Sequence, residues 1–138
     1  MESGMAVAPI VTLFVSSLLV LMKLFLGLRV SMYRNKINMP WGDNGDDQLV
    51  RRIRAHANHS EWVPATVIIL GLVEMVGVSP LIVGVLGAIV IIARGLHALG
   101  LMGNAESFNR ATGIVMNWIV LFLASIIGIV EFFAPGSF

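Results

Sequence analysis

The chain has 138 residues, of which 57% are hydrophobic and 12% are charged, against roughly 25% charged in soluble domains. A net charge of +1 gives no indication of nucleic-acid binding, and the absence of cysteine excludes disulfides, cysteine-ligated metal sites and a cysteine nucleophile. The composition predicts one integral membrane domain over residues 1–138, with room for about four spans of ~20 residues.

Four apolar segments are long enough to cross a membrane. The first begins near Met5 and continues past Lys23 to residues 29–33, so it is too long for a signal peptide and shows no convincing cleavage site. The second covers residues 49–76, the third 81–102 and the fourth 110–133. We therefore expect an all-α, integral membrane four-helix bundle.

Turn-forming residues separate these spans. Residues 34–48 are rich in Asn, Asp, Gly and Pro, so we expect the one sizeable loop there. A hydropathy window alone would take residues 75–93 as one continuous span, but Gly77 and Pro80 interrupt that run. Pro64 lies inside the second span and removes one backbone hydrogen bond.

The basic residues predict the orientation of the bundle. All nine lysines and arginines fall toward the first and third connections: Lys23, Arg29, Arg34, Lys36, Arg51, Arg52, Arg54, Arg94 and Arg110. By the positive-inside rule both of these connections are cytoplasmic. In a bacterial inner membrane, both termini would then be periplasmic.

A dense polar cluster opens the second span, where residues 51–61 read RRIRAHANHSE. Ionisable groups at this depth are costly and normally mark a site. Steps of three, four and three residues place four polar side chains on one helix face. They are Arg51, Arg54, Asn58 and Glu61.

An antiparallel arrangement brings three more polar residues to the same depth. They are Arg94, His97 and Arg110. The four arginines of this zone meet one carboxylate, Glu61, because Glu74 and Glu131 fall near the opposite surface. The surplus of about three positive charges indicates an anionic ligand or phospholipid headgroups. Arginine forks suit carboxylates, while Glu61 with Asn58 suits an ammonium or amide group, so a peptide with two carboxylates and one amine would fit.

Two other interpretations of these residues stay open. Arg94 and Glu61 could pair with each other and serve only the structure of the bundle. His56 and His59 are three residues apart and could share a metal with Glu61 or His97, but without a clear third ligand we expect polar packing near the interface.

The same cluster carries a family resemblance. The run Arg54-Ala-His-Ala-Asn58-His-Ser-Glu61-Trp-Val-Pro64 resembles the R-A-x-x-N-x-x-E-Y/F-x-P signature of the MAPEG superfamily, the membrane-associated proteins of eicosanoid and glutathione metabolism. Basic residues also match at three further places: Lys23, Arg94 with His97, and Arg110. The resemblance covers nearly the whole chain and is closest to the bacterial, microsomal-glutathione-transferase-like branch.

The resemblance implies a trimer of four-helix bundles with glutathione sites at the subunit interfaces. It implies that Arg54, Asn58 and Glu61 bind glutathione as co-substrate, with Arg94 and His97 near it. Arg110 would hold the tripeptide as a thiolate, which would conjugate or reduce a lipophilic small molecule arriving through the membrane lipid.

The chain departs from the family's pattern at three positions. Leu101 stands where mammalian enzymes have a tyrosine, Trp62 follows the glutamate, and Ala111 replaces a hydroxyl residue after Arg110. The alternative is therefore a non-catalytic membrane protein whose basic cytoplasmic-side pocket binds anionic lipid or another small anion.

Overall fold

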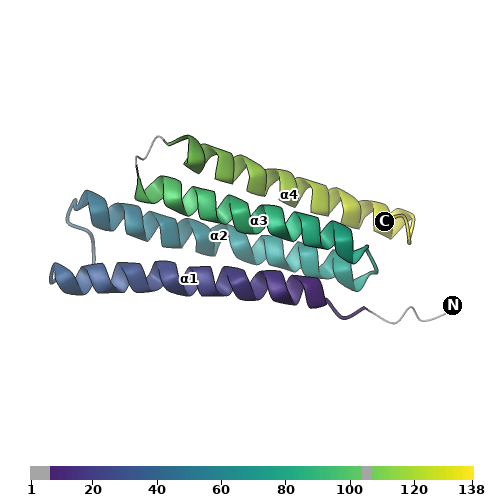
Figure 1. Cartoon of the computed structure of the whole chain (residues 1–138), viewed down its shortest axis with the longest axis horizontal. Coiled ribbons are helices and arrows are strands. Elements are labelled where there is room, and N and C mark those ends of the chain that lie inside the picture. The colour runs from purple at the N-terminus through teal and green to yellow at the C-terminus, as the bar shows by residue number, and fades with distance from the viewer. Residues whose placement is uncertain (1–6, 104–106) are drawn as a thin grey trace.

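A computed structural model describes residues 7–103 and 107–138, which form four α-helices (Figure 1). They are α1 (Ile10–Lys36), α2 (Asp47–Met75), α3 (Pro80–Met102) and α4 (Phe108–Phe133). The all-α bundle predicted from the sequence is confirmed. The expected start of the first span at Met5 lies outside the described residues.

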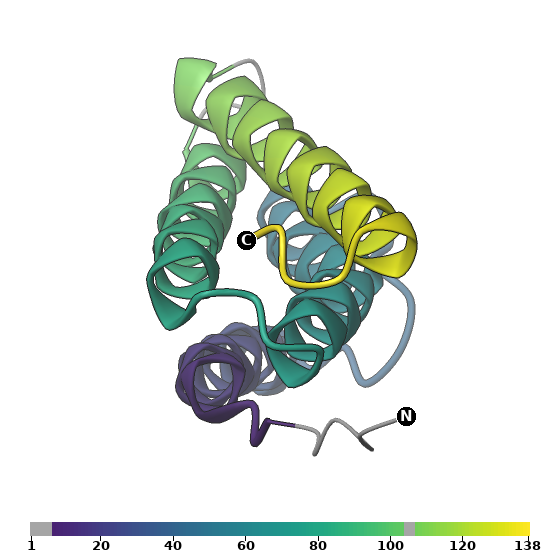
Figure 2. The same cartoon turned by 90° about the vertical axis from the view of Figure 1, so that its right-hand side faces the viewer.

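Successive helices run antiparallel, so the start of α1 and the end of α4 lie at one end of the bundle (Figure 1). The α1–α2 loop and the start of α4 lie at the other end, which we call the basic end. Viewed along the bundle, α2 and α3 stand between α1 and α4 (Figure 2). Among the described residues α1 contacts α2 and α3, and it makes no contact with α4.

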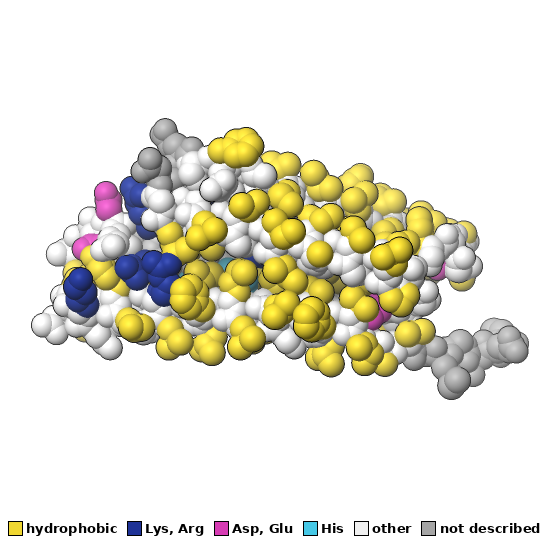
Figure 3. Space-filling view, in the orientation of Figure 1, with side chains coloured by type: hydrophobic (Ala, Val, Ile, Leu, Met, Phe, Trp, Pro, Cys, Tyr) yellow, Lys and Arg dark blue, Asp and Glu magenta, His cyan; other side chains and the backbone are white. Residues whose placement is uncertain are grey.

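The surface and the helix lengths are those of an integral membrane protein. Three helices, α1, α3 and α4, are long and apolar enough to cross a membrane. The shortest, α3, has 23 residues and spans about 35 Å, against ~30 Å of hydrocarbon. Helix α2 is longer, with 29 residues, but its first half is polar. Figure 3 shows hydrophobic side chains over most of the visible face and Lys and Arg at the basic end.

The helix boundaries follow local signals in the sequence. α2 ends at Met75 and α3 begins at Pro80, with Gly77 between them at φ +99°. A non-glycine residue is strained at that angle, so the continuous span over residues 75–93 is excluded, as expected. The first loop is shorter than predicted because α1 continues to Lys36 and Asp46 caps α2, its Oδ1 accepting from Leu49 N at 2.7 Å.

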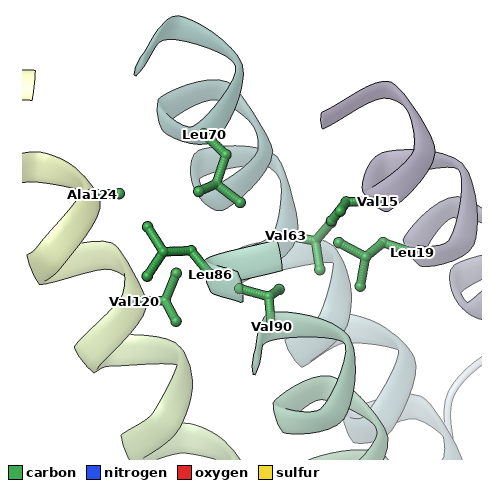
Figure 4. Packing of buried hydrophobic residues seen from close by; sticks show 8 residues of the cluster. All are labelled: Val15, Leu19, Val63, Leu70, Leu86, Val90, Val120 and Ala124. Carbon is green, nitrogen blue, oxygen red and sulfur yellow. The ribbon is translucent and has the colours of Figure 1, made fainter. Parts of the chain in front are cut away.

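A buried apolar cluster holds the four helices together at mid-length (Figure 4). Each helix contributes two residues: Val15 and Leu19, Val63 and Leu70, Leu86 and Val90, Val120 and Ala124. At the end opposite the basic end, the buried carboxylate of Glu74 in α2 accepts from Val11 N (2.8 Å) and Thr12 N (2.7 Å). Glu74 thus caps the start of α1 and fixes its register against α2.

Candidate functional site

The polar face of α2 points away from the core of the bundle. Arg54 and Glu61 are exposed and Asn58 is half-buried between them. The two charged residues are seven positions apart, which places them two turns or about 10 Å apart along the helix axis. The three residues share one accessible face, as expected. Ala55, His59 and Val63 occupy the buried face of the same helix.

Arg94 lies behind this face, inside the bundle, with only 1% of its surface exposed. Its Nη2 donates a hydrogen bond of 2.6 Å to Asn58 Oδ1, while its buried Nε has no partner among the described residues. The sequence left open a structural pair between Arg94 and Glu61. The structure instead joins Arg94 to Asn58 and leaves Glu61 exposed.

This contact decides what Asn58 can offer a ligand. Arginine only donates hydrogen bonds, so the atom facing Arg94 is the amide oxygen. The amide nitrogen remains available as a donor, and it suits a carboxylate or a carbonyl oxygen. The amide oxygen uses one of its two lone pairs on Arg94, and Glu61 offers a charged acceptor for an ammonium group.

His97 is also buried, and it connects α3 to the head of α4. Its Nδ1 lies 3.0 Å from the backbone oxygen of Arg110, so in the neutral ring Nδ1 carries the proton. The backbone of Arg110 is thereby held against α3 while its side chain stays exposed. Like Arg94, His97 supports the polar zone from within.

Two glycines permit this close approach of α3 and α4. A Cβ at Gly113 would lie 2.7 Å from His97 N, and one at Gly100 would lie 2.8 Å from Arg110 Cα. Both distances are below any normal contact, so only glycine fits. The sequence shows no sign of these contacts, because α3 holds several glycines and the partners in the facing helix are more than nine residues away.

Arg51 bonds to the backbone at the end of α3, whereas Arg54 and Glu61 lie exposed on the accessible face of α2. It is half-buried, and its Nη1 donates to the backbone oxygen of Gly103 at the end of α3. No hydrogen bond joins Arg51, Arg54, Arg94 or Arg110 to a carboxylate in the described parts of the chain. Within the described residues, none of these four guanidinium groups is therefore neutralised by a hydrogen-bonded carboxylate.

Asn117 is a further buried polar residue that sequence reasoning did not find. It is fully buried in α4, and neither atom of its amide has a partner among the described residues. The next residue, Trp118, packs against Trp62 of α2 with ring centroids 6.1 Å apart. A lone amide within an apolar span was the available signal, since such a group must find hydrogen-bond partners.

The histidines of α2 pack within the bundle. The Nε2 of His59 lies 2.9 Å from the backbone oxygen of Leu19, and the ring of His56 faces Gly27 of α1. Within the described residues, no group of three or more His, Asp or Glu side chains could hold a metal ion.

Leu101 belongs to a small apolar cluster behind the site. It packs with Leu26, Ala55 and Ala98, and it brings no hydroxyl group to the space beside His97. Ala111, after Arg110, is exposed and also lacks one.

Comparison with known proteins agrees with the residue pattern of α2. The sequence pattern of the MAPEG family matches residues 12–130, which is most of the chain. The chain belongs to the MAPEG family. The family resemblance drawn from the signature 54–64 is therefore confirmed.

Two curated relatives of this MAPEG protein are inner membrane proteins. The Inner membrane protein YecN of Escherichia coli strain K12 is 28% identical over 109 residues, which cover 79% of this chain and 81% of that protein. YecN of Escherichia coli O6:H1 matches with the same identity and coverage. The names of these relatives state a location and no activity.

Proposed function

We propose that this MAPEG protein binds glutathione on the polar face of α2. The observation that carries the proposal is the triplet Arg54, Asn58 and Glu61, presented on one accessible face and backed by the buried Arg94. Arg54 would pair with a carboxylate of the tripeptide, the Asn58 amide nitrogen would donate to a second carboxylate or a carbonyl, and Glu61 would accept from the ammonium group.

The exposure of Arg54 and Glu61 supports an oligomer as the functional form, and the family resemblance makes that oligomer a homotrimer. A charged side chain at the centre of a span costs about 2.5–3.5 kcal/mol, so such groups avoid lipid-facing positions. In a single subunit, no other described helix covers Arg54 and Glu61 on this face of α2. A second copy of the chain that covered it would shield the charges from lipid and close a site for glutathione between subunits.

Arg110 is the residue that we propose for thiol activation. It is exposed at the head of α4, where the partial positive charge of the helix N-terminus adds to that of the guanidinium. A free thiol has a pKa of about 8.5, and nearby positive charge lowers it. The thiolate would attack the carbon of an aryl halide or similar lipophilic electrophile, and the halide ion would leave with the bonding electrons.

We further propose a location in the inner membrane, with the site on the cytoplasmic side and both termini periplasmic. The positive charge at the basic end supports this orientation. Glutathione is a water-soluble peptide, so the site must open to an aqueous compartment, whereas an apolar substrate would enter from the bilayer.

Calorimetric titration of the detergent-solubilised protein with glutathione tests the binding. We expect Glu61→Gln to weaken binding by about 2 kcal/mol, as for loss of a charged hydrogen-bond partner in a desolvated site. Asp47→Asn is the matched control, because Asp47 is an exposed acid in the first turn of the same helix. Equal affinities of the two variants would contradict the assignment of this face.

A second candidate is a non-catalytic anion-binding protein, favoured by the buried, hydroxyl-free position of Leu101. Bound glutathione thiolate absorbs in the near ultraviolet, so the difference spectrum with and without glutathione separates the two. Binding without this absorbance and without turnover would favour the anion binder.

A further inference from the structure

Two arginines at the basic end lie apart from the polar face of α2. Arg52 Nη1 donates to the backbone oxygen of Arg29 in α1 at 3.3 Å, and the Arg52 guanidinium lies 4.5 Å from the centroid of the Tyr33 ring. The Arg29 guanidinium reaches across to Met102 Sδ at the end of α3 and lies 5.8 Å from the centroid of the Phe25 ring. The aromatic rings and the backbone hold both side chains on the seam of α1 with its neighbours.

This pair is separate from the proposed glutathione site. Arg52 and Arg54 are two positions apart on α2, so their side chains point to different sides of the helix. Arg52 faces α1, whereas Arg54 is on the open face.

The charges of the pair are not balanced by the described part of the protein. The nearby carboxylate of Asp46 is already engaged, because it accepts from Leu49 N at 2.7 Å and from the Tyr33 hydroxyl at 3.4 Å. No described carboxylate bonds to Arg29 or Arg52. Each guanidinium carries five N–H donors and makes one hydrogen bond here, and the Arg52 Nε is buried without a partner.

The position of the pair relates it to the membrane surface. Leu28 and Met32 lie on either side of Arg29 in α1 and are exposed, as is Phe25, four residues before Arg29. Apolar side chains of this kind contact acyl chains, and the basic end follows immediately. The unsatisfied donors therefore lie where acyl chains meet headgroups, and anionic lipids bind to basic pockets at this level.

We propose that Arg29 and Arg52 form a binding site for the phosphate group of a membrane phospholipid. A phosphate diester offers oxygens that match the planar fork of arginine, and its negative charge would relieve the repulsion between the two guanidinium groups. The acyl chains of the lipid would lie along the exposed apolar side chains of α1.

Native mass spectrometry of the full chain in detergent, titrated with phosphatidylglycerol, tests this site. We expect Arg52→Gln to weaken lipid binding by about tenfold or more, as for loss of a charged hydrogen-bond donor. Lys36→Gln is the control, because Lys36 is exposed at the same end of α1 and loses the same charge. Equal losses in the two variants would show a general effect of charge and would overturn the proposal.

Further measurements keep the result specific. Arg52→Lys retains the charge without the planar fork, so we expect its affinity for phosphatidylglycerol to be intermediate. Unchanged far-ultraviolet circular dichroism would show that the variants fold. Soluble glycerol 3-phosphate and glutathione should each fail to displace phosphatidylglycerol. Displacement by glycerol 3-phosphate would identify a site for soluble phosphate, and displacement by glutathione would assign Arg29 and Arg52 to the peptide site; either result would overturn the proposal.

Discussion

Replacing Gly113 by alanine tests how closely α3 must approach α4. The added Cβ would lie 2.7 Å from His97 N and 2.8 Å from His97 Cβ, and neither a backbone atom nor a Cβ can move without its helix. Overpacking of this kind costs about 1–3 kcal/mol, while the better helix propensity of alanine returns about 1 kcal/mol. We expect a net destabilisation of up to about 2 kcal/mol.

Gly95→Ala is the matched control for this experiment. Gly95 is also in α3, but its Cβ would meet nothing within 4 Å, so alanine should stabilise the protein by up to about 1 kcal/mol. The free energy of unfolding can be measured in mixed micelles by titration with sodium dodecyl sulfate, followed by circular dichroism. If Gly113→Ala were as stable as Gly95→Ala, the close contact of α3 with α4 and the placement of Arg110 by His97 would both be wrong.

Three further predictions concern the site and the topology. Asn58→Asp keeps an acceptor for Arg94 but loses the amide donor, so the fold should persist. Calorimetry should show glutathione affinity reduced by about tenfold or more, and unchanged affinity would exclude Asn58 from the binding site. Arg110→Ala should largely retain glutathione binding but suppress both the thiolate absorbance and conjugation of an aryl halide, and full activity in this variant would exclude the proposed role. A reporter fused after Phe138 should lie in the periplasm and one within residues 37–45 in the cytoplasm, and the reverse pattern would contradict the proposed orientation.

The structure also explains how a buried arginine can serve this site. Arg94 lies in the bundle without a described carboxylate, a placement that costs several kcal/mol unless hydrogen bonds compensate it. One such bond goes to Asn58, whose amide is thereby held in a single orientation. The energetic cost is consistent with a positioning role, because a rotating amide would offer a ligand its donor only part of the time.

Local signals in the sequence were sufficient for the helices and for the family. The apolar runs between turn residues predicted α3 and α4 to within one or two residues, because glycine, proline and capping side chains act on their immediate neighbours. The spacing of Arg54, Asn58 and Glu61 likewise predicted their common face, because helix geometry fixes which residues align.

The tertiary structure alone decided which polar residues face outward and which support them. α3 is apolar nearly all round, so its periodicity could not show that Arg94 and His97 point into the bundle. The close approach of α3 to α4 at Gly100 and Gly113, and the meeting of Arg29 with Arg52 across α1 and α2, join residues far apart in the chain. Such contacts depend on how the helices rotate and pack against one another, and the residue pattern within a single helix does not specify that rotation.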